Sequence, residues 1–409
     1  MRAALVALAL VAPAARAATP DAKAKKSLAA GIRLYHKLDL AESAQRLDDA
    51  LDSVPGWKTA AGFRAGTRWT LGDGEGAASD ARIAGKLSPN DAQSYAARGK
   101  ARLVLRDYDG ALADFRASAA KDPRSVEGPL GEGSVLSAQG KTKEALRPLN
   151  DAVKRDPSSA AALLMRGSVK DRLRDFRGAA EDYGALLEIN PKFSWARLYR
   201  GKTLRELKDY RGSEADFTQF LETNDEHEDG HYLRSNVRFL LGDYHGAIAD
   251  LTKVIAVNPR KGLAYSNRGQ TRALLGDKQG AISDLKKALE LDPARRDKIQ
   301  AAIDALEQKD APEPEPEPAP KTVRQTAPET AAPRRVAGRD APSFGDDGPT
   351  VSVEKAGSDL PAKKVRAPEA DLDDAPDPKK NEDKPARRGK HDEASERHNG
   401  EEESLFIDK

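Results

Sequence analysis

The sequence predicts an all-α solenoid of eight 34-residue helix-turn-helix repeats, followed by a capping helix and a disordered C-terminal tail. Three observations predict it: a 34-residue proline period, small residues at two fixed places of each repeat, and helix breakers between those places. Two short helices cannot bury their apolar stripes alone, but they can against neighbouring copies. We therefore expect contacts only between adjacent repeats, and an open trough instead of an enclosed reactive cavity.

Composition restricts the class of protein before any motif is considered. The 409 residues are 33% charged and 5% aromatic, which favours exposed helix over a large aromatic core. Cysteine is absent, which excludes disulfides, thiolate metal sites and cysteine nucleophiles. The formal net charge of +2 gives no overall reason to expect nucleic acid or an anionic membrane as the partner.

Residues 1–17 have the pattern of an export signal. The apolar stretch 3–12 is too short for the roughly 20 residues that a membrane helix needs. Ala15 and Ala17 flank Arg16 in the small-residue pattern that precedes cleavage, so we expect the mature chain to begin at Ala18. An uncleaved anchor is the alternative. No second apolar run follows, so no membrane span is expected after cleavage.

The repeats are predicted over residues 24–295, and their register is fixed by prolines. These lie 34 residues apart, with one double gap of 68 in which Asp225 stands at the vacant place. The prolines are Pro55, Pro89, Pro123, Pro157, Pro191, Pro259 and Pro293. Seven unbroken intervals of 34 residues therefore define eight copies without an insertion.

Small residues mark the points where the two helices of a repeat pack closely. The first set is Gly31, Ala65, Gly99, Gly133, Gly167, Gly201, Ser235 and Gly269. The second set, twelve residues later, is Ser43, Ala77, Ala111, Ala145, Ala179, Ser213, Ala247 and Ala281. Breakers such as Gly72-Asp73 and Gly242-Asp243 lie between the two sets, so each copy is predicted to be helix, turn, helix and a proline-marked turn.

The period, the small-residue places and the closing proline resemble the tetratricopeptide repeat family over about two thirds of the chain, with residues 265–293 matching best. The resemblance implies a right-handed superhelix whose first helices line a concave groove for partner segments. Together with the export signal, it implies a bacterial periplasm or cell envelope, with secretion as the alternative. The first two copies depart furthest, and Leu38 replaces the glycine that turns several other copies. We therefore expect the N-terminal end to fray.

Two different segments follow the repeats. Residues 296–309 carry Ile299, Ile303 and Leu306 on one stripe, which predicts an amphipathic helix. In the resembled family such a helix caps the last apolar face. Residues 310–409 contain 14 prolines and only 11 Leu, Ile, Val or Phe, which predicts disorder. Their net charge is −7 against +9 for residues 1–309, so the tail could attract the repeats; a solvated spacer is the alternative.

An arginine and an aspartate recur together, sixteen residues apart, in six of the eight copies. The pairs are Arg64 and Asp80, Arg98 and Asp114, Arg166 and Asp182, Arg200 and Asp216, Arg234 and Asp250, and Arg268 and Asp284. Copies one and four lack both members. We predict structural, partly buried bidentate salt bridges that join the two helices of a repeat. Desolvation offsets most of the attraction in such pairs, so they fix geometry more than they stabilise.

No motif supports catalysis, a metal site or a cofactor. His227-Glu228-Asp229-Gly230-His231 matches the His-Glu-x-x-His zinc pattern, but it straddles the junction of copies six and seven. His231 stands at a place that Tyr95 and Leu163 fill elsewhere, which favours packing or solvent exposure. Gly72, Gly74 and Gly76 imitate a dinucleotide loop without the strand that must precede it. We therefore expect no enzyme.

The family resemblance places candidate peptide-binding residues on the first helices of copies six to eight. They are Trp195, Tyr199, Lys202, Arg205, Tyr232, Asn236, Phe239, Asn267 and Gln270. Asparagine amides can bond both groups of a peptide backbone, and aromatic side chains add anchoring area, which suits a peptide of some acidic character. The alternative is that Trp195, Tyr232 and Phe239 only pack between copies.

A clamp for a C-terminal carboxylate, which some members of the resembled family use, is not expected. Asn236 and Asn267 match its asparagines, but Tyr232, Asp297 and Ala301 stand at its basic places. The sequence therefore favours a noncatalytic scaffold that binds a protein or peptide, with no nucleic acid or small-molecule substrate. The alternative is a structural spacer that docks on a large envelope assembly without a peptide groove.

Overall fold

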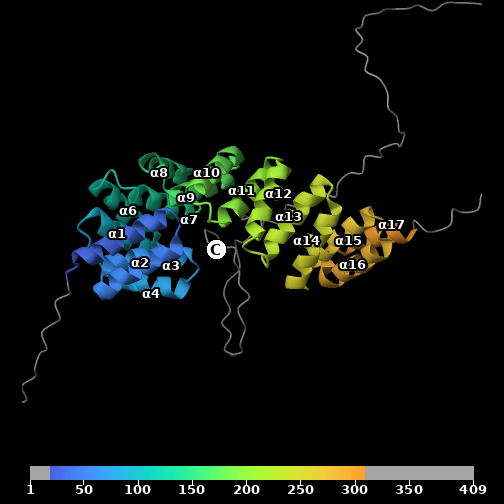
Figure 1. Ribbon diagram of the computed structural model, residues 1–409, viewed down its shortest axis with the longest axis horizontal. Coiled ribbons are helices and arrows are strands. Elements are labelled where there is room, and N and C mark those ends of the chain that lie inside the picture. The colour runs from blue at the N-terminus through green and yellow to red at the C-terminus, as the bar shows by residue number, and fades with distance from the viewer. Residues whose placement is uncertain (1–18, 309–409) are drawn as a thin grey trace, which may run out of the picture. The chain divides into compact units, whose positions relative to one another are not determined.

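A computed structural model describes residues 19–308 of the chain, and the predicted export signal and the predicted disordered tail lie outside these residues. Each repeat contributes two antiparallel neighbouring helices (Figure 1). The first helices are α1 (Ala22–His36), α3 (Lys58–Thr70), α5 (Ala92–Val104), α7 (Glu127–Ala138), α9 (Ala160–Arg172), α11 (Trp195–Glu206), α13 (Glu228–Leu241) and α15 (Gly262–Leu274). The second helices are α2 (Leu40–Ser53), α4 (Gly74–Ala84), α6 (Tyr108–Lys121), α8 (Thr142–Arg155), α10 (Phe176–Ile189), α12 (Tyr210–Leu221), α14 (Tyr244–Val257) and α16 (Lys278–Leu291).

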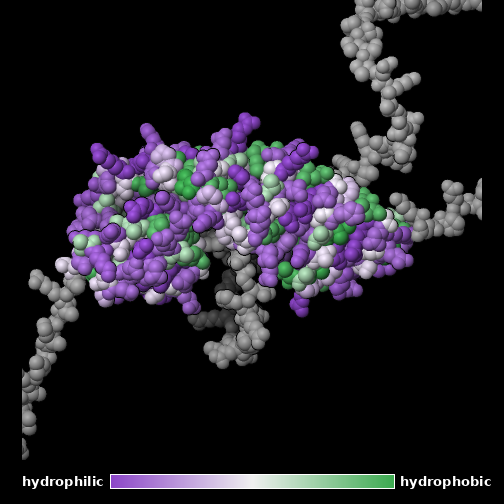
Figure 2. All heavy atoms as spheres, in the orientation of Figure 1, coloured by the Kyte–Doolittle hydropathy of each residue, from purple (hydrophilic) through white to green (hydrophobic). Residues whose placement is uncertain are grey.

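The predicted all-α solenoid is confirmed, since residues 19–308 contain helices and turns but no strand. A 3₁₀ turn (Pro293–Arg295) leads into α17 (Arg296–Gln308), whose Ile299 and Ile303 pack against Leu285 of α16. No helix in this part of the chain is long and apolar enough to cross a membrane. Hydrophilic residues cover most of the visible face, as the charged composition predicts (Figure 2).

Within a repeat, the first small-residue place receives a large side chain from the second helix. A β-carbon at Gly201 would lie 2.7 Å from the ring of Phe217, and one at Gly167 would lie 2.8 Å from Tyr183. Both rings are almost completely buried. The recurrent glycine therefore brings the two helices close enough to share one core, which explains why the sequence period carries it.

The turn between the two helices has one backbone conformation in all eight repeats. Its residue lies in the left-handed region, with φ between 60° and 85°. Glycine occupies the place in four repeats, whereas Leu38, Arg106, Arg174 and Lys208 occupy it in the others. In six repeats the next residue is an aspartate that accepts a hydrogen bond from the N–H of a glycine three residues later, which caps the second helix.

The first five repeats close on themselves, and this corrects the expectation that only adjacent copies touch. Helix α1 packs against α9, four repeats away, in addition to α3 (Figure 1). One apolar cluster joins Leu38 and Leu40 to Leu163, Tyr183 and other buried residues of repeats four and five. The expected fraying of the N-terminal end is also wrong, because the turn after α1 is buried by these contacts.

Small residues on the inner faces of α3 and α5 permit this closure. A β-carbon at Gly62 would overlap the carbonyl oxygen of Ala97, so the two backbones are in direct contact. Ala60, Ala61 and Ala96 are also fully buried there. Helices that approach so closely turn the row of first helices more sharply than large side chains would allow. Curvature over repeats two to five therefore brings repeat one back against repeat five.

Candidate functional site

The structure brings together all six arginine and aspartate pairs. In each, Nε and Nη2 of the arginine donate to the two carboxylate oxygens over 2.6–3.0 Å. The six aspartates are buried, and they lie on the second helix of the repeat whose first helix carries the arginine. Each pair therefore joins the two helices of one repeat with fixed, fork-like geometry.

Sequence reasoning missed a second cation on five of these aspartates. It lies one helical turn after the paired arginine and approaches the same carboxylate within 2.7–3.1 Å. The residues are Arg68, Arg102, Lys170, Arg238 and Arg272. Repeat six carries Leu204 at this place instead. The four-residue spacing was visible in the sequence and could have found this contact.

Some arginines of the six arginine–aspartate pairs also link neighbouring repeats. Nη1 of Arg166 donates to Asn150, and Nη1 of Arg268 donates to Thr252, each a residue of the preceding second helix. In copy four, where the arginine is replaced by Glu132, the preceding helix carries Arg116, and its Nε lies 3.0 Å from Glu132. The link between copies three and four therefore persists with its charges reversed.

A cavity of about 840 Å³ opens where copy four lacks its aspartate. It lies between α6, α7 and α8, beside Pro148, which stands in the aspartate's place. Its wall contains the Arg116 to Glu132 pair and an ion pair between Arg155 and Asp151. With Lys143, Glu144 and Arg147, the lining has four basic and three acidic side chains, so the cavity offers no concentrated charge for a ligand.

The histidine pair of the zinc-like motif is used in two separate contacts. His227 caps α13, since its Nδ1 accepts a hydrogen bond from Gly230 N–H over 3.0 Å. His231 is buried, with Nδ1 at 2.9 Å from Asp250 and Nε2 at 2.8 Å from the Asp225 carbonyl oxygen. Burial would raise the pKa of Asp250, but bonds from His231 and Arg234 lower it. Across residues 19–308, no group of three or more His, Asp or Glu is arranged to hold a metal.

The second site lies within repeats one to five, which we call the closed half. Here repeats four and five contact the turn that follows α1. We call residues 35–40 the first-repeat turn. His36 lies between Glu127 of α7, at 2.8 Å from Nε2, and Ser159, at 3.1 Å from Nδ1. The amide of Asn190 donates to the Lys37 carbonyl oxygen over 2.9 Å. The side chains that hold this turn therefore come from repeats four and five.

A buried charge cluster supports this contact. Nζ of Lys100 lies 3.1 Å from Glu127 Oε2 and 4.4 Å from the centre of the Tyr35 ring. Burial alone would raise the pKa of Glu127, but Lys100 and His36 lower it to about 2. Glu127 is therefore ionised across the neutral range and is bound from two sides.

The nine candidate peptide-binding residues lie on α11, α13 and α15, outside the closed half. We call them the C-terminal surface, and all nine are half-buried. Tyr232 is the best connected, because Asn267 donates to its hydroxyl over 3.2 Å and Lys261 lies 4.8 Å from its ring centre. Burial raises the pKa of Tyr232, and bonds to Asn236 and Asn267 partly oppose this. A phenol and two amides from adjacent repeats therefore form one polar group.

Two of the aromatic residues make ring contacts inside the solenoid. The Trp195 ring meets Phe220 and His227 edge-on, with centroids 5.5 and 5.4 Å away, which places it between repeats six and seven. Phe239 lies against Tyr244 of its own repeat, with a centroid distance of 5.4 Å. Their contacts inside the solenoid account for much of their apolar area.

The remaining residues of the C-terminal surface bring polar and charged groups. Burial raises the pKa of Tyr199 to about 12, and its ring lies 5.9 Å from that of Tyr183. Arg205 bonds its neighbour Glu206 through Nη2, while its buried Nε has no hydrogen-bond acceptor among the described residues. Burial raises the pKa of Asp171, and the Thr203 hydroxyl and the charge of Lys202 only partly oppose this.

Gln270 is the last of the nine residues of the C-terminal surface. Its side-chain amide donates to Ser266 over 3.3 Å, one turn earlier on α15. The C-terminal surface thus offers amides, a phenol and an arginine with a free donor, which are groups that recognise backbone and carboxylate oxygens. It brings together no nucleophile with a hydrogen-bonded base, which general acid–base or nucleophilic catalysis requires.

Comparison with known proteins points to one family. The family model described as "Tetratricopeptide repeat" matches residues 96–160, 130–192, 164–229 and 232–296. A search of curated proteins found no match.

Several solved structures are similar in fold. The APC/C hetero-tetramer Cut9-Hcn1 aligns with a TM-score of 0.52 and 13% identity, over 68% of this chain and 55% of that chain. YrrB, described as a TPR protein with an unusual peptide-binding site, aligns at 0.44 and 18% identity, over 46% of this chain and 97% of that chain. PilF of Pseudomonas aeruginosa aligns at 0.43 and 18%, over 53% and 96%. Identities this low show the fold alone.

Proposed function

The repeat region belongs to the tetratricopeptide repeat family, and from that premise we propose that the protein is a noncatalytic scaffold that binds a segment of a partner protein on the C-terminal surface. Proteins of this fold present the first helices of successive repeats to their partners. Here the first half of that face is filled by the chain itself, so the part on α11, α13 and α15 is the one offered to another protein.

One observation supports this proposal above the others. Tyr232, Asn236 and Asn267 form a polar group across two repeats. One repeat away, Arg205 has a buried Nε without an acceptor among residues 19–308. Amides and guanidinium groups recognise carbonyl and carboxylate oxygens of an incoming chain. The expected partner is therefore an extended or loop segment with some acidic character.

The test is recovery of partners from cell envelopes with the full-length chain as bait. The double variant Asn236→Ala and Asn267→Ala is expected to lose most of the partner recovered by the wild type, because it removes two amides from the surface. The matched control, Lys253→Ala with Gln279→Ala, changes two exposed side chains on α14 and α16 and should recover the wild-type amount.

Equal recovery by the double variant and the wild type would contradict the proposal. It would favour the alternative of a structural spacer that docks through another face. Circular dichroism of both variants checks that the helices are retained, so that a loss of binding reports on the surface and not on folding.

We also propose that the protein works outside the cytoplasm, in a bacterial periplasm or cell envelope. The support is the sequence of residues 1–17 alone. Terminal sequencing of protein recovered from an envelope fraction should give a chain that starts at Ala18. A chain that starts at Met1 in the cytoplasmic fraction would contradict export.

A further inference from the structure

One segment of the chain, the first-repeat turn, packs against the inner face formed by repeats three to five. We propose that the inner face of repeats three to five is a recognition site for a helix-terminal turn with an aromatic residue, a histidine and a leucine, and that the first-repeat turn is its resident ligand. This site is separate from the C-terminal surface, so it goes beyond the function proposed above. The class of ligand follows from the contacts that the resident turn makes.

Polar contacts bind the histidine side chain and one backbone carbonyl of the turn. His36 meets a carboxylate on one ring nitrogen and the hydroxyl of Ser159 on the other. Asn190 binds the backbone carbonyl of the next residue, Lys37. A segment with another side chain in place of His36 would leave the buried Glu127 without one of its two partners, which is costly in a buried site.

A cation–π contact binds the tyrosine, and apolar packing binds the leucine. The ring of Tyr35 covers the ammonium group of Lys100 at 4.4 Å. Leu38 is 5% exposed and lies in the apolar cluster of repeats four and five. Its φ of 60° is the left-handed conformation that this turn adopts in every repeat, so burial and not backbone conformation sets Leu38 apart.

Repeat one is the exception among eight similar turns. In the other seven repeats the residue at the place of Leu38 is Gly, Arg or Lys, and it is exposed. Only the first repeat has a tyrosine, a histidine and two leucines within the six places that match residues 35–40. Its turn therefore differs from the others where it contacts distant repeats.

The receiving residues also have partners outside the turn. Lys100 and Glu127 pair across repeats three and four, and Ser159 caps α9 by accepting from Ala162 N–H. Repeat one is the first of the eight repeats, so it can leave without breaking the contacts among repeats two to eight. The site therefore persists when the turn leaves, and the same segment supplied from outside can occupy it.

The experiment supplies the turn in trans. The probe is a fluorescent synthetic peptide of residues 22–42. The receiver is the full chain with Tyr35→Ala and Leu38→Gly, which removes two of the three recognised side chains, keeps His36 and leaves the receiving residues intact. Binding is followed by fluorescence anisotropy. We expect binding to this variant at least about tenfold tighter than to the wild type, whose resident turn competes at an effective concentration near the millimolar range.

Two controls identify the site. A peptide with the same two substitutions should not bind, and Glu127→Gln added to the receiver should weaken binding of the native peptide several-fold. Equal binding of native and substituted peptides, or no binding of the native peptide at about 1 mM, would overturn the proposal.

A second measurement on the wild type covers the case in which the receiver variant does not fold. Unlabelled peptide in excess should speed amide hydrogen exchange of residues 35–40 by displacing them, while exchange in α15 stays unchanged. Unchanged exchange at residues 35–40 would show that the turn is a fixed structural element, and would overturn the proposal.

Discussion

At the scale of single residues, buried charges set the geometry of the repeats. Each buried aspartate of the six pairs receives two bonds from one arginine, and five receive a second cation. A lone buried carboxylate would be strongly unfavourable, so the cations compensate its desolvation. The period of arginine and aspartate was visible in the sequence because both members recur every 34 residues. The Lys100 to Glu127 pair occurs once and had no repeating signal.

Repeat six gives the cleanest test of a pair, because Asp216 has Arg200 as its partner and Leu204 in place of the second cation. Asp216→Leu should lower the free energy of unfolding by about 3 kcal/mol, at the low end for buried pairs because the Arg200 side chain is 31% exposed. Adding Arg200→Met should restore most of it, since no unpaired charge remains. Denaturant unfolding followed by circular dichroism measures both.

The control for the pair is Arg46→Ala in copy one, where the arginine makes only exposed contacts with Glu42 and Asp49. Its loss should cost less than about 1 kcal/mol. A double variant at repeat six that is as unstable as the single one would contradict the account of the pair.

Acid should weaken the closed half through Glu127. Its folded pKa of about 2 lies below the ordinary 4.5, so its contribution is fully present above about pH 4.5 and is lost as the pH falls toward 2. The shift corresponds to roughly 3 kcal/mol. The difference in unfolding free energy between wild type and Glu127→Gln should therefore shrink between pH 5 and pH 2. A constant difference over this range would contradict the buried cluster.

At the scale of elements, the positions of helices and turns follow from the local sequence. The burial of the first-repeat turn against distant repeats does not. The left-handed residue recurs in every repeat, and four repeats adopt it without glycine. That place can therefore be predicted from the period alone. Leu38 and Lys208 share the same backbone conformation, yet one is buried and the other exposed, which depends on distant repeats.

These two residues form a matched pair of substitutions. Lys208→Gly should raise the unfolding free energy by about 0.5 kcal/mol, because relief of left-handed strain exceeds the extra freedom of an unfolded glycine. Leu38→Gly should lower it by roughly 2–4 kcal/mol, since the lost leucine contacts outweigh the same relief. Effects of the same sign and size at both positions would contradict the burial of Leu38.

The close approach of α3 and α5 is the element-level cause of closure. Gly62→Ala should destabilise the protein by about 1–3 kcal/mol, because the new methyl group meets the backbone of α5. Gly184→Ala is the control, since a β-carbon there would have only Arg200 Nη1 within 4 Å, at 3.7 Å. Thermal unfolding of both variants should show a clear loss for Gly62→Ala alone. A tolerated Gly62→Ala would mean that the helices are not held this closely.

At the scale of the whole molecule, repetition predicts how each copy is built but not how many copies complete a turn. Curvature accumulates from small rotations between neighbours. In repeats two and three these rotations depend on the backbone contact between Gly62 and Ala97. The pattern of small residues in the sequence does not show how strongly such a contact curves the row of helices. The C-terminal surface was selected by place in the repeat, and the structure leaves it outside the closed half.

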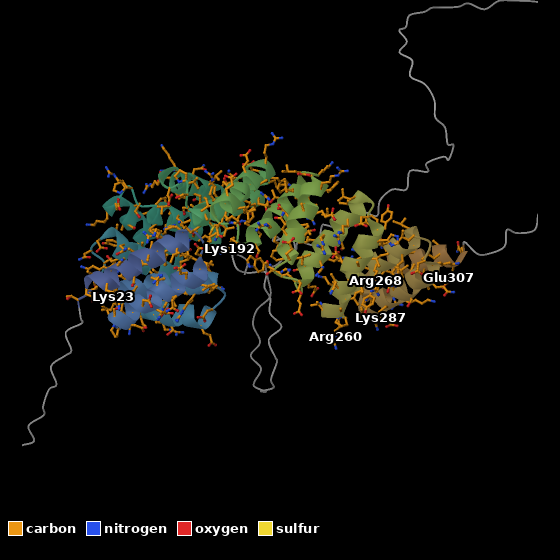
Figure 3. All side chains as sticks on the ribbon, in the orientation of Figure 1. Lys23, Lys192, Arg260, Arg268, Lys287 and Glu307 are labelled. Atoms are coloured by element: carbon orange, nitrogen blue, oxygen red, sulfur yellow. The ribbon has the colours of Figure 1, made fainter. Side chains whose placement is uncertain are left out.

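Closure has a direct test that needs no variant. Asn190 bonds the Lys37 carbonyl oxygen, and Lys192 lies two residues further on, in the segment that joins α10 to α11 (Figure 3). In a stack with contacts only between adjacent repeats, more than four repeats would separate these two lysines, or roughly 40 Å at helix spacings of 8–10 Å.

Crosslinking of the full-length chain with a short amine-reactive reagent, followed by mass spectrometry, should give a Lys37 to Lys192 link within one molecule. A chain in which both lysines react singly and link only to lysines of adjacent repeats would contradict the closed N-terminal half, and with it the assignment of partner binding to the C-terminal surface.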